Sequence, residues 1–246
     1  MKKGKVNAKK GLLWTLILLI VVLAVVIYLL ATQETAQVTS GTLRLSGAKV
    51  VLDAGHGGRD AGTSGVTTQV KESDINLQIT LRLQAALEAE GAQVVMTRET
   101  EAAIGDSKDA DMEKRRQIIS ESNQDVTVSI HQNSYEDSSV SGPQVFYAPG
   151  SAEGGKLAKC VQDALNEQLK IEDPLTQHEG NYYIVKSGAA PAVIVECGFL
   201  SNPEEEVLLQ KEAYQIQIVQ AIVDGIVSYL DTSEGGGSQV GTTTAD

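Results

Sequence analysis

The sequence has little histidine, little cysteine and, over most of its length, little positive charge. It contains three histidines in 246 residues, and its two cysteines are too few for a disulfide framework. After residue 32 the chain carries 15 basic and 32 acidic residues. Nucleic acids and anionic membrane surfaces both attract Lys and Arg, so this balance argues against either one as a partner of that part of the chain.

The sequence also has few signals of a boundary between domains. Between Lys49 and about Leu230 there is neither an internal repeat nor a Pro-, Gly- or Ser-rich break, and 42% of the whole chain is hydrophobic. This stretch is therefore expected to form one domain, residues 48–231. The remaining residues, 232–246, are rich in Gly, Ser and Thr and are expected to be a disordered tail.

The amino terminus alone is basic and strongly apolar. Five lysines lie in residues 1–10, and an uncharged apolar run extends from Gly11 to Ala31. About 20 apolar residues span a bilayer as a helix, whereas a cleaved secretory signal has an apolar stretch of about 7–15 residues. We predict a cytoplasmic segment (1–10), a transmembrane signal-anchor (11–31) and a stalk (32–47). The positive-inside rule then places the domain outside the cell membrane. Cleavage at Ala31 is the alternative.

Strand and helix signals alternate along the domain. They predict an α/β fold with a mostly parallel, twisted sheet of about five to six strands covered by helices on both faces. Strands are expected at residues 50–52, 94–97, 126–130, 145–148, 182–185 and 192–195. Helices are expected from residue 73 or 74 to about 90, at 110–122, at 151–169 and, as one helix, from 203 to 230.

The most distinctive stretch runs from Val50 to Gly58, where a β-branched strand ends in a glycine-rich turn around His56. Such glycines allow backbone angles that are closed to other residues and keep side chains away from the turn. His56 is thus expected just past the carboxyl end of a strand, the edge at which open α/β sheets bind ligands. His131 directly follows another expected strand, so the two histidines could converge.

Two histidines at strand ends favour a metal site over two unrelated core or surface histidines. A catalytic zinc takes three protein ligands and leaves one position for water. His56 and His131 would supply two of them. The candidates for the third ligand are Asp53, Asp60, Glu72, His178, Glu196 and Cys197. This reasoning leaves Glu72 and His178 both open, because a carboxylate such as Glu72 also suits a helix amino terminus without any metal.

Glu196 is unusual because it directly follows the apolar run Ala192–Val195. Burying a carboxylate is costly unless the group is paired or functional, and burial raises its pKa toward the range needed for proton transfer near neutral pH. Glu196 could take a proton from a water whose pKa zinc lowers to about 7, which would permit amide hydrolysis. The alternative is an ion pair with Lys186. Cys197 should point to the opposite face as a core residue, and Cys160 falls on the apolar face of a helix.

Six motifs, in order, resemble those of zinc-dependent N-acetylmuramoyl-L-alanine amidases of the type-3 family. They are Asp53–Gly58, Lys71–Leu77, Met96–Arg98, Ser129–Asn133, Asn181–Tyr183 and Val195–Asn202. The resemblance implies one Zn²⁺ held by His56, Glu72 and His131, with Glu196 catalytic, and so favours Glu72 over His178. It also implies the substrate, which is the amide joining N-acetylmuramic acid to L-alanine of the peptidoglycan stem peptide.

Two features depart from the family pattern. Gln132-Asn133 stands where members commonly have Ala-Asn, and we expect Gln132 at the mouth of the cleft. Asn133 and Lys186 are the candidate substrate-binding residues. Residues 134–143 are too short for the helix that occludes the zinc in some members, so we expect an open cleft, or activation by a partner protein that acts in another way.

Within the family, the single anchor and the Val-Glu-Cys-Gly motif most resemble spore-cortex amidases, which remove stem peptides so that muramic δ-lactam can form. A vegetative wall amidase is the alternative. A zinc carboxypeptidase on the same wall peptides would need a cationic pocket, for which Lys186 and Arg98 are the only obvious candidates. A catalytically inactive wall-binding module would be expected to lack a zinc ligand or Glu196, and neither is lost.

Overall fold

The computed structural model describes residues 14, 18–19, 21 and 43–235. The expected cytoplasmic segment, nearly all of the expected anchor and most of the expected stalk lie outside these residues, as does the tail beyond residue 235. Among the described helices, none combines the length and the apolar character needed to cross a membrane. The description below concerns the compact unit that begins at Leu43.

A six-stranded, mostly parallel sheet forms the centre of this unit, in the order β2–β1–β3–β6–β4–β5. Its strands are β1 (Lys49–Ala54), β2 (Gln93–Met96), β3 (Val126–Asn133), β4 (Gln144–Tyr147), β5 (His178–Glu179) and β6 (Ala192–Phe199). Strands β2, β1, β3 and β6 are parallel, and β4 runs antiparallel to β6. The predicted α/β class and the predicted number of strands are both confirmed.

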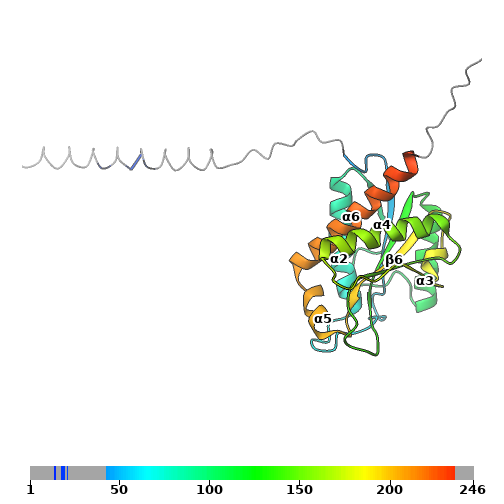
Figure 1. The fold of residues 1–246 in the computed structure, drawn as a ribbon, viewed down its shortest axis with the longest axis horizontal. Coiled ribbons are helices and arrows are strands. Elements are labelled where there is room, and N and C mark those ends of the chain that lie inside the picture. The colour runs from blue at the N-terminus through cyan, green and yellow to red at the C-terminus, as the bar shows by residue number, and fades with distance from the viewer. Residues whose placement is uncertain (1–13, 15–17, 20, 22–42, 236–246) are drawn as a thin grey trace, which may run out of the picture. The chain divides into compact units, whose positions relative to one another are not determined.

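Helices cover both faces of the sheet (Figure 1). On one face lie α2 (Glu72–Ala89), α4 (Ala152–Leu169) and α6 (Glu212–Gly235); on the other lie α3 (Lys108–Glu121) and the 3₁₀ helix η1 (Ile184–Lys186). Successive side chains of a strand point to opposite faces, so Val50 and Leu52 enter the larger core while Val51 enters the smaller one. Both faces are covered, and the strand sequence is therefore apolar without alternation.

Two elements differ from the prediction. The strand expected at 182–185 is a loop followed by η1, because β5 already pairs with β4 at that edge of the sheet. The single carboxyl-terminal helix is instead two, α5 (Pro203–Leu209) and α6. At the break, the Gln215 side chain donates to the carbonyl of Leu209 at 2.8 Å. A side chain thus supplies a donor to a carbonyl at the end of α5.

The folded unit also extends past both expected boundaries. Leu45, assigned to the stalk, is 2% exposed and belongs to the larger core. Arg44 forms ion pairs with Glu90 and Asp224. At the other end α6 continues to Gly235, so residues 232–235 are helical and are not the start of the tail.

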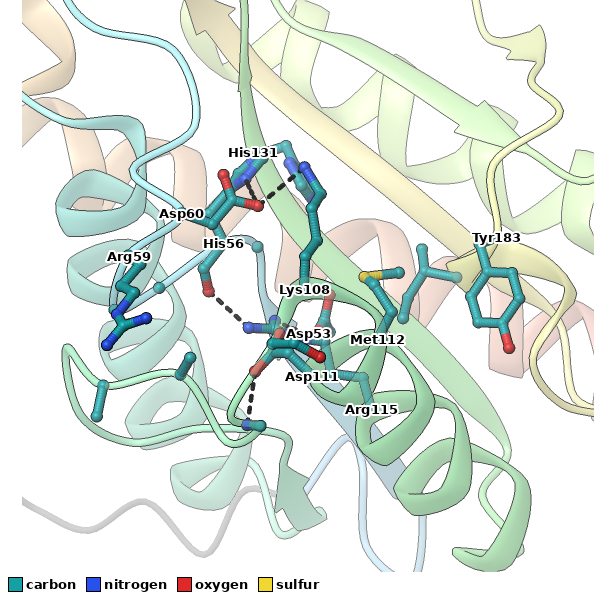
Figure 2. A pocket seen from close by; sticks show the side chains of 18 of the residues that line it. Asp53, His56, Arg59, Asp60, Lys108, Asp111, Met112, Arg115, His131 and Tyr183 are labelled. Carbon is teal, nitrogen blue, oxygen red and sulfur yellow. Dashed lines mark hydrogen bonds and ion pairs between the residues drawn. The ribbon is translucent and has the colours of Figure 1, made fainter.

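A buried ionic network lies beneath the carboxyl end of β1 (Figure 2). Arg115 of α3, which is 1% exposed, donates to Asp53 Oδ1 at 2.8 Å and to Asp111 Oδ2 at 2.6 Å. Its guanidinium also donates to the carbonyls of Ala54 and His56, each at 2.6 Å. One buried cation therefore ties α3 to the backbone of the glycine-rich turn.

Arg98, which follows β2, contacts the same turn through its guanidinium. It donates to the carbonyls of Ala54 at 2.8 Å, Gly55 at 2.8 Å and Ser73 at 2.9 Å. Burial, together with the charge of Arg115, lowers the pKa of Arg98 to about 10, so the guanidinium remains charged at neutral pH. Together the two arginines bind three consecutive carbonyls of the turn and fix its path.

Removing one partner of the buried Asp53–Arg115 pair should strongly destabilise the fold. Burial alone would raise the pKa of Asp53, but the charge of Arg115 and the hydrogen bonds from Ser129 and Thr97 together outweigh that effect and hold the pKa below its usual value. In metal-free protein at pH 7 we expect Asp53→Asn to lower the free energy of unfolding by about 3 kcal/mol, since it leaves a buried cation partly unpaired. Urea denaturation measures this difference.

The same pair gives a pH dependence with a definite sign. A carboxylate with a lowered folded-state pKa stabilises the fold above its unfolded-state pKa of about 3.9, and this contribution is lost as the pH falls through the folded-state value. The difference between wild type and Asp53→Asn should therefore shrink below about pH 4. Asp163→Asn, which removes an exposed pair with Lys159, is the control and should leave stability unchanged. Equal stability of wild type and Asp53→Asn at pH 7 would contradict this account.

Close packing of α4 on α6 gives a second stability prediction. A Cβ at Gly225 would lie 2.6 Å from the Cα of Val161, which is helix backbone that cannot rotate away. We expect Gly225→Ala to lower the free energy of unfolding by about 1–3 kcal/mol, although alanine is the better helix former. Gly155→Ala is the control, because its nearest neighbour is a ring atom of Tyr147 at 3.2 Å. Equal thermal stability of Gly225→Ala and wild type would contradict the packing argument.

Candidate metal centre and active site

The three expected metal ligands meet at the carboxyl edge of the sheet. His56 follows β1, Glu72 begins α2 and His131 lies near the end of β3. Glu72 Oε1 lies 3.2 Å from His56 Nε2 and 2.9 Å from His131 Nδ1. One ligand atom from each residue lies within 4.8 Å of the others. Two imidazoles and one carboxylate are a common donor set for catalytic zinc, so this group could hold a metal ion.

The orientation of His56 follows from its backbone and from one carboxylate. Its φ of 60° lies in the left-handed region, which non-glycine residues rarely adopt. Asp60 Oδ2 lies 3.1 Å from His56 Nδ1 and 3.1 Å from Lys108 Nζ, between the two groups (Figure 2). Asp60, a candidate ligand from the sequence, therefore lies behind the histidine and directs Nε2 toward Glu72. A carboxylate behind a ligating histidine fixes both its tautomer and its ring orientation.

The position of His131 depends on the absence of a side chain at Gly55. A Cβ at that position would lie 2.3 Å from His131 Cε1. The two imidazole rings meet edge to face, with centroids 5.0 Å apart. Gly55 is thus required by the close approach of His131.

Glu72 is ionised within this group. Burial alone would raise its pKa, but hydrogen bonds and charge from His131 and His56 outweigh burial and hold the pKa far below its usual value. The backbone amides of Thr63, at 2.9 Å, and Gln132, at 3.2 Å, also donate to its carboxylate. Both carboxylate oxygens are therefore held by the protein itself.

Glu196 lies beside this group on β6, where it is the register partner of His131 on β3. Residues paired in this way project from the same face of a sheet. Its Oε2 is buried and has no hydrogen-bond partner among the residues that the structure describes. Burial raises the pKa of Glu196 to about 7, with the charge of Glu72 raising it and that of His131 lowering it. A buried carboxylate with a free oxygen next to a candidate metal site can act as a proton acceptor.

The ion pair considered for Glu196 is not formed. Lys186 Nζ instead donates to Asn181 Oδ1 at 2.7 Å. Cys197 is fully buried in the larger core, as expected for a neighbour on the opposite face, and Cys160 is partly buried against that core.

A cleft of about 880 Å³ opens onto His56 and His131, whose side chains are 22% and 21% exposed. The start of α3 lines it, together with the loop before that helix and Tyr182 and Tyr183 (Figure 2). Residues 134–143 form a loop without a helix, as expected from their length. In this structure that segment leaves the candidate metal site open.

The other expected site residues lie elsewhere. His178, in β5, is exposed and lies against the Phe146 ring, with centroids 6.4 Å apart, and it does not join the metal-ligand group. Asn133 and Lys186 are absent from the lining of the cleft, so their role in substrate binding stays a prediction. Arg98 already binds backbone carbonyls, which leaves it poorly suited to bind the terminal carboxylate of a carboxypeptidase substrate.

The prediction for Gln132 is wrong. Its side chain is 3% exposed and hydrogen-bonds to Asn76 of α2, away from the mouth of the cleft. Strand β3 continues to Asn133, past its expected end at Ile130, and alternation along the strand directs His131 and Gln132 to opposite faces.

Comparisons with known proteins support the interpretation of this site. The profile of the N-acetylmuramoyl-L-alanine amidase family matches residues 50–228. The germination-specific N-acetylmuramoyl-L-alanine amidase of Bacillus subtilis (strain 168) is 34% identical over 197 residues, which span 77% of this chain and 82% of that protein. The probable cell wall amidase LytH of Staphylococcus aureus is 31% identical over 187 residues, which span 76% of this chain and 60% of that protein.

The fold is also similar to that of a solved amidase. The structure of the CwlD amidase from Clostridioides difficile, solved in complex with the GerS lipoprotein, matches with a TM-score of 0.72 and 36% sequence identity. That match covers 75% of this chain and 99% of the other. The family profile covers most of the chain and includes the whole candidate site. The chain therefore belongs to the N-acetylmuramoyl-L-alanine amidase family.

Proposed function

We propose that this chain is a zinc-dependent N-acetylmuramoyl-L-alanine amidase, which hydrolyses the amide between N-acetylmuramic acid and the L-alanine of the peptidoglycan stem peptide. The observation that carries the proposal is the His56–Glu72–His131 group with the unpaired carboxylate oxygen of Glu196 beside it. Membership of the amidase family supports the identity of the bond.

His56, Glu72 and His131 would hold the zinc ion. Their mixed imidazole and carboxylate donors suit zinc among the common divalent metals. When bound in such a site, zinc polarises a carbonyl oxygen and lowers the pKa of water to about 7.

The proton transfers are assigned to Glu196. Its free Oε2 takes a proton from the attacking water and then gives that proton to the nitrogen of the leaving L-alanine. A pKa near neutral suits both steps, since the group must accept the proton and later release it. Asp60 meanwhile holds the Nδ1 side of His56, which leaves Nε2 directed at the metal position.

The proposed cellular location is the outer side of the cell membrane, with residues 11–31 as the anchor. The lysines of residues 1–10 and the apolar run that follows support this assignment. Peptidoglycan is the proposed partner outside the membrane. The C. difficile relative was solved in complex with the GerS lipoprotein, which supports a partner protein for this chain too.

A role in the spore cortex is the finer proposal. Likeness to the germination-specific amidase of B. subtilis supports it, whereas likeness to LytH supports a vegetative role in the cell wall. Deletion of the gene in its host separates these roles: loss of muramic δ-lactam from spore peptidoglycan is expected for the first, and unchanged δ-lactam with altered vegetative wall for the second.

Removing the proposed proton acceptor tests the assignment of Glu196. We expect Glu196→Gln to lower kcat on purified peptidoglycan by about a hundredfold or more, since general acid–base groups contribute about 10²–10⁴ to the rate. One zinc per chain should remain bound, because Glu196 is not a proposed ligand. Glu136→Gln, at an exposed position in the loop after β3, is the matched control and should keep full activity. Near-normal kcat in Glu196→Gln would exclude this role.

The pKa of Glu196 sets the expected pH dependence. Burial raises the pKa to about 7 in the absence of a metal ion, and a nearby divalent cation would lower it. Below the pKa the proton-accepting form is depleted, so kcat/KM should fall toward acid pH with a midpoint at or below about 7. The measurement is kcat/KM against pH with saturating zinc. A rate that increases from about pH 8 to about pH 5 would contradict the assignment.

A further inference from the structure

Gln132 lies behind the candidate metal site and not in front of it. Its neighbour His131 faces the cleft, whereas the Gln132 side chain is buried on the opposite face of β3, against α2. A buried amide needs hydrogen-bond partners, because a polar group without one is costly to bury. Gln132 Oε1 has no such partner among the described residues, but Gln132 Nε2 contacts a side chain that leads directly to a proposed metal ligand.

The contacts form a chain of three side chains. Gln132 Nε2 donates to Asn76 Oδ1 at 3.1 Å. Asn76, which is fully buried, donates through Nδ2 to Glu72 Oε1 at 3.2 Å and to the carbonyl of Gly55 at 3.1 Å. Asn76 thus links the carboxylate of Glu72 to the turn that bears His56.

The orientation of the Asn76 amide decides whether this link exists. Its NH₂ group must face Glu72 and Gly55, both of which are acceptors, so its oxygen must face the other way and needs a donor. Gln132 Nε2 is that donor. Without Gln132, Asn76 Oδ1 would lose this donor. If the Asn76 amide then rotated to find another donor, its oxygen would turn toward the Glu72 carboxylate.

We propose that Gln132 is a positioning residue for the metal ligand Glu72, acting through Asn76. The proposal rests on the assignment of Glu72 as a zinc ligand in the proposed function. Groups behind the ligands of a metal site commonly change metal affinity by 10–100-fold when removed.

The test is zinc affinity, measured on the full chain by competition with a chromophoric chelator at fixed pH. Gln132→Met keeps the length of the side chain but removes its donor, and we expect it to weaken zinc binding about tenfold. The visible absorption spectrum of the cobalt-substituted protein should also change, since the geometry of Glu72 would shift. Gln132→Ala is a second variant in case methionine does not pack.

Gln215→Met is the matched control. Gln215 is an equally buried amide that donates to the carbonyl of Leu209 and to Gln78 Oε1 of α2, and it has no hydrogen bond to Glu72 or Asn76. Its substitution should lower thermal stability without changing zinc affinity or the cobalt spectrum. If both Gln132 variants behave like Gln215→Met, Gln132 has only a structural role and the proposal is overturned.

A double variant tests whether Gln132 acts on Glu72 through Asn76. Asn76→Leu should weaken zinc binding at least as much as Gln132→Met, and the double variant should be no worse than Asn76→Leu alone, because both act on the same hydrogen bond to Glu72. Additive losses would overturn the proposal. A wild-type chain that binds no zinc would overturn the proposed function itself. Normal zinc binding by wild type and both Gln132 variants would overturn only the role of Gln132.

Discussion

The Glu72 carboxylate is the group on which the site depends. It is buried and ionised, and a buried charge is stable only when it is well paired. Its hydrogen bonds come from the β1 turn, the following loop, α2 itself and the end of β3. These segments meet only when the sheet and α2 are in place. The ligand group therefore exists as a property of the complete fold and not of any short segment.

The turn after β1 must hold His56 in a left-handed backbone conformation, which is unfavourable for a residue with a side chain. Arg115 and Arg98 stabilise it by binding the carbonyls of three consecutive residues. The charge of Arg115 is in turn compensated by Asp53 and Asp111. The same turn thus serves the cleft and the ionic network under it. The turn presents the His56 imidazole to the cleft, and the ionic network holds the backbone from which that imidazole projects.

The sequence predicted features with local signals. The β-branched run before the glycine turn located β1 and His56, and Glu196 stood out as a charge in an apolar strand. Features set by distant partners were not predictable. Nothing local shows that Arg115, 59 residues after His56, binds its carbonyl. The direction of Gln132 depended on β3 continuing past Ile130, which pairing with β6 decides. Likewise β5, and not residues 182–185, occupies the sheet edge because of its pairing with β4.

The most direct test of the account is to identify the new amino terminus that the full chain exposes when it digests purified peptidoglycan in the presence of zinc. Hydrolysis at the proposed bond predicts peptides that begin with L-alanine, with no such peptides formed after zinc is removed by a chelator and with activity restored when zinc is returned. Release of free D-alanine, without any new L-alanine amino terminus, would show that the site cleaves the other end of the stem peptide and would contradict the account.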